Sequence, residues 1–156
     1  MTKKRPKKAP KRKRPVQLPD RPSDLIELAL RDLEACEQDP RYEINMSRWH
    51  YPTDGEPVEE PVDICLVCLA GSVMAKSLRM PPTKCLAAWD AGDQSGKLLA
   101  LDRFREGRID EGLKDLGMAR GREGMADAEV PTYAVDRDGF FAAMRSIAKT
   151  LRSMGL

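Results

Sequence analysis

The sequence predicts an α+β fold that is predominantly helical, in which a small two-stranded hairpin is packed by four to five helices. Its 156 residues correspond to about one domain. Apolar residues recur at helical spacing over several long stretches, and two shorter stretches have the patterns expected of strands. Aromatic residues make up only 5% of the chain, so aliphatic side chains must form most of the core.

The charge distribution divides the chain into two parts. Residues 1–22 hold ten Lys and Arg and one acid, a net charge of +9, whereas residues 23–156 hold 17 basic and 24 acidic residues, a net charge of −7. The first part is rich in proline and has no apolar periodicity, so it cannot bury enough surface to offset its ordering entropy. We therefore predict a disordered basic tail over residues 1–22 and a single globular α+β domain over residues 23–156.

The first predicted element is a helix that starts just after the basic tail. Asp24 as N-cap and Glu27 three residues later have the spacing of a capping box. Apolar residues between positions 25 and 36 recur on one helical face, and Asp39-Pro40 ends the pattern.

The next part of the sequence predicts the hairpin. Residues 42–50 alternate between apolar and polar side chains, which is typical of a half-buried strand. The acidic residues 52–61 include three prolines and predict a loop. The apolar residues from 62 onward predict a second strand, followed from about Cys68 by a closely packed helix that ends before Met80-Pro81-Pro82.

Three more helices are predicted in the second half of the chain. They cover residues 95–106 and 108–116, which end at Gly107 and Gly117, and residues 140–154 at the C-terminus. Between the last two, residues 118–130 are rich in charge and glycine and predict a mobile loop.

The basic tail is typical of an arm that contacts nucleic acid, because each cation near a phosphate releases a condensed counterion. This attraction is independent of base sequence. The predicted phosphate-contacting residues are Lys3, Lys4, Arg5, Lys7, Lys8, Lys11, Arg12, Lys13 and Arg14. The alternatives are a solubilising extension, a nuclear import signal, or an arm that folds back on its own acidic body.

The sequence gives no indication of a membrane protein. It has no run of roughly 20 apolar residues and no apolar segment behind its N-terminal charges, so we expect a cytoplasmic protein without a membrane partner.

Four cysteines and one histidine are the residues most able to carry chemistry. Without a secretion signal, free thiols or a metal site are expected rather than disulfides. Cys65, Cys68, Cys85 and His50 form a ligand set that suits tetrahedral zinc. However, the C-x-x-C pair lies in a strongly apolar stretch, which favours core packing. No cofactor is expected, with zinc as the alternative.

The same residues raise the possibility of a thiol-dependent enzyme. Cys68 at the start of a helix would be the nucleophile, and His50 would take its proton. The sequence lacks a phosphate-cradling glycine-rich loop and a serine elbow, so no other catalytic motif competes with this pair.

One segment is similar to a known group of proteins. Arg48-Trp49-His50 together with the stretch 65–75, preceded by a helix ending Asp32-Leu33-Glu34, resembles small uncharacterised proteins of bacteriophages and prophages. The likeness covers about residues 24–80. It implies a bacterial host cytoplasm and an accessory role, and it carries no assigned activity or functional residues.

These observations favour a non-enzymatic accessory binding protein of phage type. Its basic tail would contact nucleic acid while its body binds a host or phage protein. Arg145, Lys149 and Arg152 recur on one face of the last helix and would extend the cationic surface, unless they are simply a solvated helix face. The first alternative is an acidic-bodied inhibitor of a host protein or defence component. Its densest acidic patch is formed by Glu56, Glu59, Glu60 and Asp63.

Overall fold

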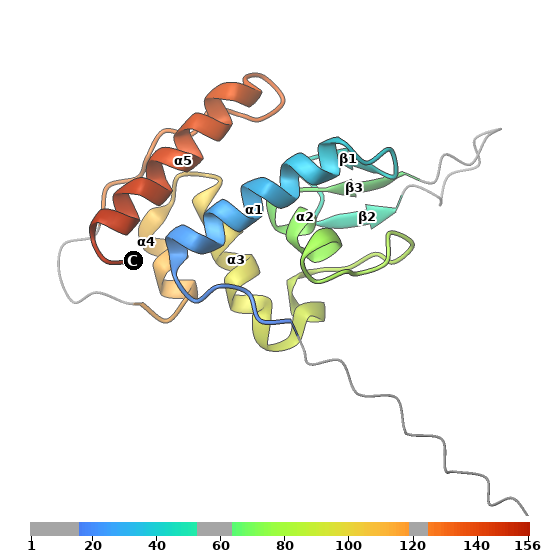
Figure 1. Cartoon of the computed structure of the whole chain (residues 1–156), viewed down its shortest axis with the longest axis horizontal. Helices are drawn as coiled ribbons and strands as arrows, with labels where there is room; N and C mark the ends of the chain where they lie inside the picture. The colour runs from blue at the N-terminus through green and yellow to red at the C-terminus, as the bar shows by residue number, and fades with distance from the viewer. Residues whose placement is uncertain (1–15, 53–63, 119–124) are drawn as a thin grey trace, which may run out of the picture.

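The computed structural model describes residues 16–52, 64–118 and 125–156, and it confirms a mixed α+β fold that is mostly helical (Figure 1). Five α-helices accompany a small three-stranded sheet and one 3-10 helix, η1. In chain order the elements are α1 (Pro22–Glu37), β1 (Tyr42–Ile44), β2 (His50–Pro52), β3 (Cys65–Val67), α2 (Leu69–Lys76), η1 (Ala88–Gln94), α3 (Ser95–Phe104), α4 (Ile109–Asp115) and α5 (Arg137–Ser153).

The sheet corrects the predicted hairpin. Its strand order is β1-β3-β2, with β1 parallel and β2 antiparallel to the central β3. The alternating stretch 42–50 forms parts of two strands because a turn interrupts it at Asn45. The Asn45 side chain accepts a hydrogen bond from the amide of Ser47, and its carbonyl accepts one from the amide of Arg48. An asparagine bonding its own backbone two residues on favours a turn over a continuing strand.

Helix α1 begins earlier than predicted. Pro22 occupies the first turn, where its missing N–H costs nothing, and the N-cap is Arg21 without a side-chain cap. The predicted capping box of Asp24 and Glu27 is wrong, because the C-terminal part of α5 packs beside this end of α1. Both carboxylates instead accept hydrogen bonds from the Arg152 guanidinium.

Helix α1 lies between α5 on one side and α2 with the sheet on the other. Figure 1 shows α5 along one side of α1, and it shows the sheet near the C-terminal end of α1. Helix α2 packs on α1 as well. Helix α3 also contacts α1, and α4 packs on α3. The largest buried side chains include Phe104, Phe140 and Phe141, so three phenylalanines anchor a core that is otherwise aliphatic.

The second half of the chain matches the predicted helices closely. Gly107 and Gly117 adopt positive φ angles of 78° and 73° just after α3 and α4, the conformation that ends a helix most easily at glycine. The predicted mobile loop is only partly described. Its last residues are tied to the body, since the amides of Met125 and Ala128 donate to the Asp110 carboxylate and the Gly107 carbonyl.

The chain packs on the body before residue 23, in a segment that the sequence assigned to the basic tail. Leu18 is only 3% exposed, and its amide donates to Oε1 of Gln94 at 2.9 Å. The Lys97 ammonium donates to the Leu18 carbonyl at 2.6 Å and pairs with Asp20. The nine predicted phosphate-contacting residues, from Lys3 to Arg14, lie outside the described residues, as does the predicted acidic patch between Glu56 and Asp63.

Candidate functional site

The single histidine is buried at the sheet. His50 begins β2 and is 1% exposed. Its Nδ1 lies 2.8 Å from the carbonyl oxygen of Lys84, which can only accept, so Nδ1 carries the proton of the neutral ring. The other nitrogen, Nε2, is buried without a hydrogen-bond partner among the described residues.

Cys65 is the thiol that the fold brings to His50. Its Sγ lies 3.6 Å from His50 Nδ1. The proton on Nδ1 is already donated to the carbonyl oxygen of Lys84. Burial raises the pKa of Cys65 to about 11 and lowers the pKa of His50 below its ordinary value. A reactive pair needs a thiolate beside an imidazolium, whereas burial here favours a thiol beside a neutral imidazole.

Cys68, the predicted nucleophile, serves as the N-cap of α2. Its Sγ accepts a hydrogen bond from the amide of Gly71 at 3.3 Å. The residue is 1% exposed, and burial raises its pKa to about 11, outweighing the helix N-terminus that was expected to lower it. The structure therefore brings Cys65, and not Cys68, into hydrogen-bonding distance of His50.

The predicted zinc ligands are only partly assembled. Cys65 and His50 are adjacent, whereas Cys68 turns to the α2 backbone and Cys85 is exposed. Within residues 16–52, 64–118 and 125–156, no group of three or more His, Cys, Asp and Glu side chains is arranged to hold a metal ion. A full tetrahedral site would need ligands that this arrangement does not bring together.

An apolar groove lies where β2, η1 and α3 meet. We call it the tryptophan groove; it encloses about 350 Å³ and is lined by Trp49, Ala87, Ala88, Trp89, Ser95 and Leu99. Trp89 is 79% exposed, which is unusual for so large an apolar side chain. The Asp90 carboxylate accepts a hydrogen bond from the Ala87 amide and so supports the turn that presents Trp89.

Sequence reasoning missed the tryptophan groove and the 3-10 helix that forms one wall. The segment Ala88–Gln94 has neither helical nor alternating apolar periodicity. The available signal was Trp89 itself, a large aromatic residue in a stretch with little else to bury.

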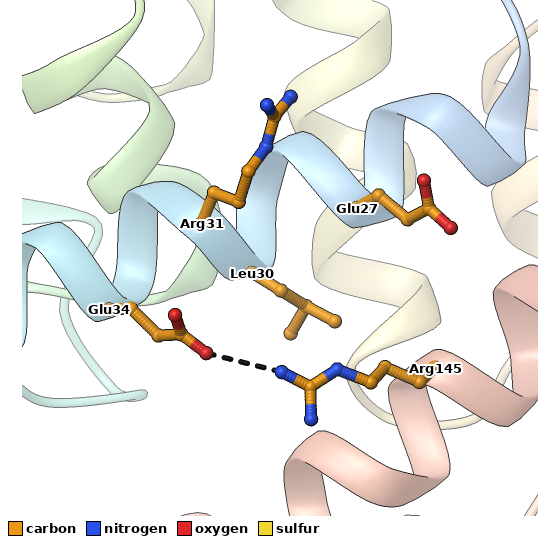
Figure 2. Close-up of a pocket in the computed structure, with 5 residues that line it drawn as sticks. All are labelled: Glu27, Leu30, Arg31, Glu34 and Arg145. Carbon is orange, nitrogen blue, oxygen red and sulfur yellow. Dashed lines mark hydrogen bonds and ion pairs between the residues drawn. The ribbon is translucent and has the colours of Figure 1, made fainter.

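A second pocket, of about 460 Å³, lies between α1 and α5 (Figure 2). Leu30 lies between the two helices, and Arg145 reaches across to donate to Glu34 at 3.2 Å. Figure 2 shows Arg31 directed away from this ion pair. The mouth therefore carries opposite charges close together, without a surplus of either sign.

The predicted cationic stripe on α5 is largely engaged in these helix contacts. Arg145 pairs with Glu34, and Arg152 pairs with both Asp24 and Glu27. Only Lys149, of the three predicted residues, has no ion pair among the described residues. These arginines hold α5 against α1, which reduces what the stripe can offer to phosphates.

Comparisons of the chain with protein-family models, with curated proteins and with solved structures found no match. No helix in the described part of the chain is long and apolar enough to span a membrane.

Proposed function

We propose that this protein is a non-enzymatic nucleic-acid-binding protein whose basic tail contacts phosphates while its body engages a partner protein. The observation that carries the proposal is the charge distribution. Nine of the 27 Lys and Arg residues lie in the first 15 positions, which contain no acid, whereas the rest of the chain is net negative. Such an arm supplies sequence-independent, salt-sensitive affinity for nucleic acid.

The anchoring of residues 17–21 supports this role. Leu18, through its contacts with Gln94 and Lys97, fixes the chain on the body just after the nine cations of residues 3–14. The arm is thus attached beside one particular surface of the fold, so a bound nucleic acid would be held near that surface. An accessory role of the phage type is part of the proposal and rests on the resemblance of residues 24–80.

The chemistry of the buried residues favours binding over catalysis. His50, Cys65 and Cys68, which we call the buried cluster, have pKa shifts that keep all three side chains neutral near pH 7. Each is also 1% exposed, so a substrate would need the fold to open before reaching any of them. A nucleophilic thiol is expected to be accessible and to have a lowered pKa.

The test is a mobility-shift titration over a salt series with the full-length chain. In one variant all nine Lys and Arg of residues 3–14 become Gln; in its matched control each Lys becomes Arg and each Arg becomes Lys. This design keeps Leu18 and its contacts, which truncation at residue 23 would remove. We expect the wild type and the control to bind with a log–log salt slope steeper than about −3, and the Gln variant to lose most of this affinity.

Binding that survives the Gln substitutions would overturn the role of the basic tail. If the wild type does not bind duplex or single-stranded nucleic acid even at low salt, the whole proposal fails. The acidic body would then be the surface to test against basic proteins.

A further inference from the structure

We propose that the tryptophan groove receives unpaired bases of a single-stranded nucleic acid whose phosphates are held by the basic tail. This inference rests on the proposed function and adds the class of nucleic acid that the protein prefers. The groove has the chemistry of a stacking platform, since Trp49 and Trp89 line it together with small apolar side chains. Base stacking on aromatic rings beside a cationic track is how many proteins bind single strands without reading sequence.

The position of the tail attachment connects the two parts of the proposed site. Gln94 at the end of η1 and Lys97 in the first turn of α3 hold Leu18, and the same two elements supply Trp89, Ser95 and Leu99 to the groove. Lys97 lies on the face of α3 opposite Ser95 and Leu99, so the attachment point and the groove are on two faces of one short segment. Figure 1 shows the described chain starting beside this end of α3. In the sequence, Arg14 precedes Leu18 by only four residues. We therefore assign the phosphates of a strand bound in the groove to the cations of residues 3–14, which precede this attachment point in the sequence.

The charges around the groove indicate that it binds bases and leaves the phosphates to the basic tail. Asp90 and Asp93 are exposed beside Trp89, and the Lys97 ammonium is already occupied by Leu18 and Asp20. The groove itself thus offers stacking surface and little attraction for phosphate. An unpaired base suits such a surface, whereas a duplex keeps its bases stacked and presents mainly phosphates.

Tryptophan fluorescence reports directly on this site because the chain has two tryptophans and both line the groove. Full-length protein would be titrated with oligo-dT and oligo-U of about 12 nucleotides, with a duplex, and with an abasic strand of equal length. We expect the base-containing single strands to quench the emission, and the abasic strand and the duplex to leave it nearly unchanged. Comparing oligo-dT with oligo-U separates DNA from RNA.

Trp89→Ala should weaken binding of oligo-dT or oligo-U by roughly 5- to 150-fold while leaving duplex affinity unchanged. Trp89→Phe, which keeps an aromatic ring, should restore most of the loss. Val135→Ala is the matched control, because Val135 is an exposed apolar residue that does not line the groove. Its affinity for single strands should equal that of the wild type.

The outcomes separate this inference from the proposed function. If single strands and duplex bind equally and Trp89→Ala changes neither, the inference is overturned while the nucleic-acid role of the tail stands. If nothing binds, the proposed function fails, and the inference fails with it. If oligonucleotides leave the emission unchanged but Trp89→Ala converts a dimer into a monomer, the groove is a protein interface and the inference is overturned.

Discussion

The buried cluster and the tryptophan groove lie on adjoining elements of the fold and differ in accessibility. His50, Cys65 and Cys68 have the more reactive side chains, and each is 1% exposed. Trp89 has no acid–base or nucleophilic chemistry, and it is 79% exposed. Residue chemistry is available for function only where the fold leaves it accessible and in a useful protonation state, so the groove is the better candidate for binding.

The two regions also differ in how tightly their atoms pack. Gly71 adjoins the buried cluster, since its amide donates to Cys68 Sγ. A Cβ added to Gly71 would meet the Trp49 carbonyl oxygen at 1.4 Å, so only glycine fits there. Trp49 thus takes part in both regions, its carbonyl facing Gly71 and its residue lining the groove. We therefore expect substitutions at or next to the buried cluster to lower stability strongly, and substitutions in the groove to change it little.

The largest expected effect is that of Gly71→Ala. Because backbone must move to relieve the clash with Trp49, we expect a loss of at least about 3 kcal/mol or a failure to fold. Urea denaturation followed by circular dichroism measures the loss. Gly96→Ala is the control: its Cβ would lie 3.0 Å from the Asp115 carbonyl, and we expect a change within about 1 kcal/mol. Equal stability of Gly71→Ala and the wild type would contradict the packing described.

The next effect concerns thiol reactivity. Cys85 is exposed, whereas Cys36, Cys65 and Cys68 are buried and the pKa of each buried thiol is raised to about 11. We expect Cys85 to react with iodoacetamide in the native state at least about 100-fold faster than the other three. Mass spectrometry after timed labelling measures this, and Cys85→Ser should remove the fast phase. Rapid native labelling of Cys65 or Cys68 would revive the thiol-enzyme hypothesis.

A smaller effect should appear in the pH dependence of stability, with opposite signs at two residues. Burial lowers the pKa of His50, so below pH 6.5 the unfolded state binds more protons and stability falls as the pH falls. Burial raises the pKa of Asp32 from 3.8 to about 6, so between these values the folded state binds more protons and stability falls as the pH rises.

Thermal melts at pH 4 to 7 can separate these two contributions. Relative to the wild type, His50→Asn should flatten the gain in stability on raising the pH toward 6.5, and Asp32→Asn should remove the loss between about pH 4 and 6. The Asn side chain at position 32 can still accept from the Ser77 hydroxyl, which lies 2.5 Å from Asp32 Oδ2. A pH profile unchanged by either variant would show that these groups titrate alike in the folded and unfolded states.

The smallest expected effect is that of Trp89→Ala on stability. Since most of this side chain is in solvent, its removal should change the free energy of unfolding by no more than about 0.5 kcal/mol. A loss several times larger would mean that Trp89 stabilises the fold. The groove and the buried cluster would then not differ in their contribution to stability. Urea melts of this variant and of Val135→Ala, run side by side, make the comparison.

The sequence predicted most helices because their information is local. The apolar spacing of α1 and α5 and the glycines after α3 and α4 each depend on a few neighbouring residues. The failures involved more distant parts of the chain. The Asp24 and Glu27 carboxylates accept hydrogen bonds from Arg152, which is more than 120 residues away in the sequence. The central strand β3 pairs in parallel with β1, which a hairpin pattern does not predict.

The sequence by itself determined the α+β class, the positions of the main helices, and the separation of a cationic segment from an acidic body. Only the tertiary structure decided that His50 and Cys65 are neighbours with neutral side chains, because burial, which shifts both pKa values, depends on what packs around them. It also decided that Trp49 and Trp89, 40 residues apart, line one groove. Local pattern encodes the elements, whereas long-range packing decides which side chains remain exposed to solvent.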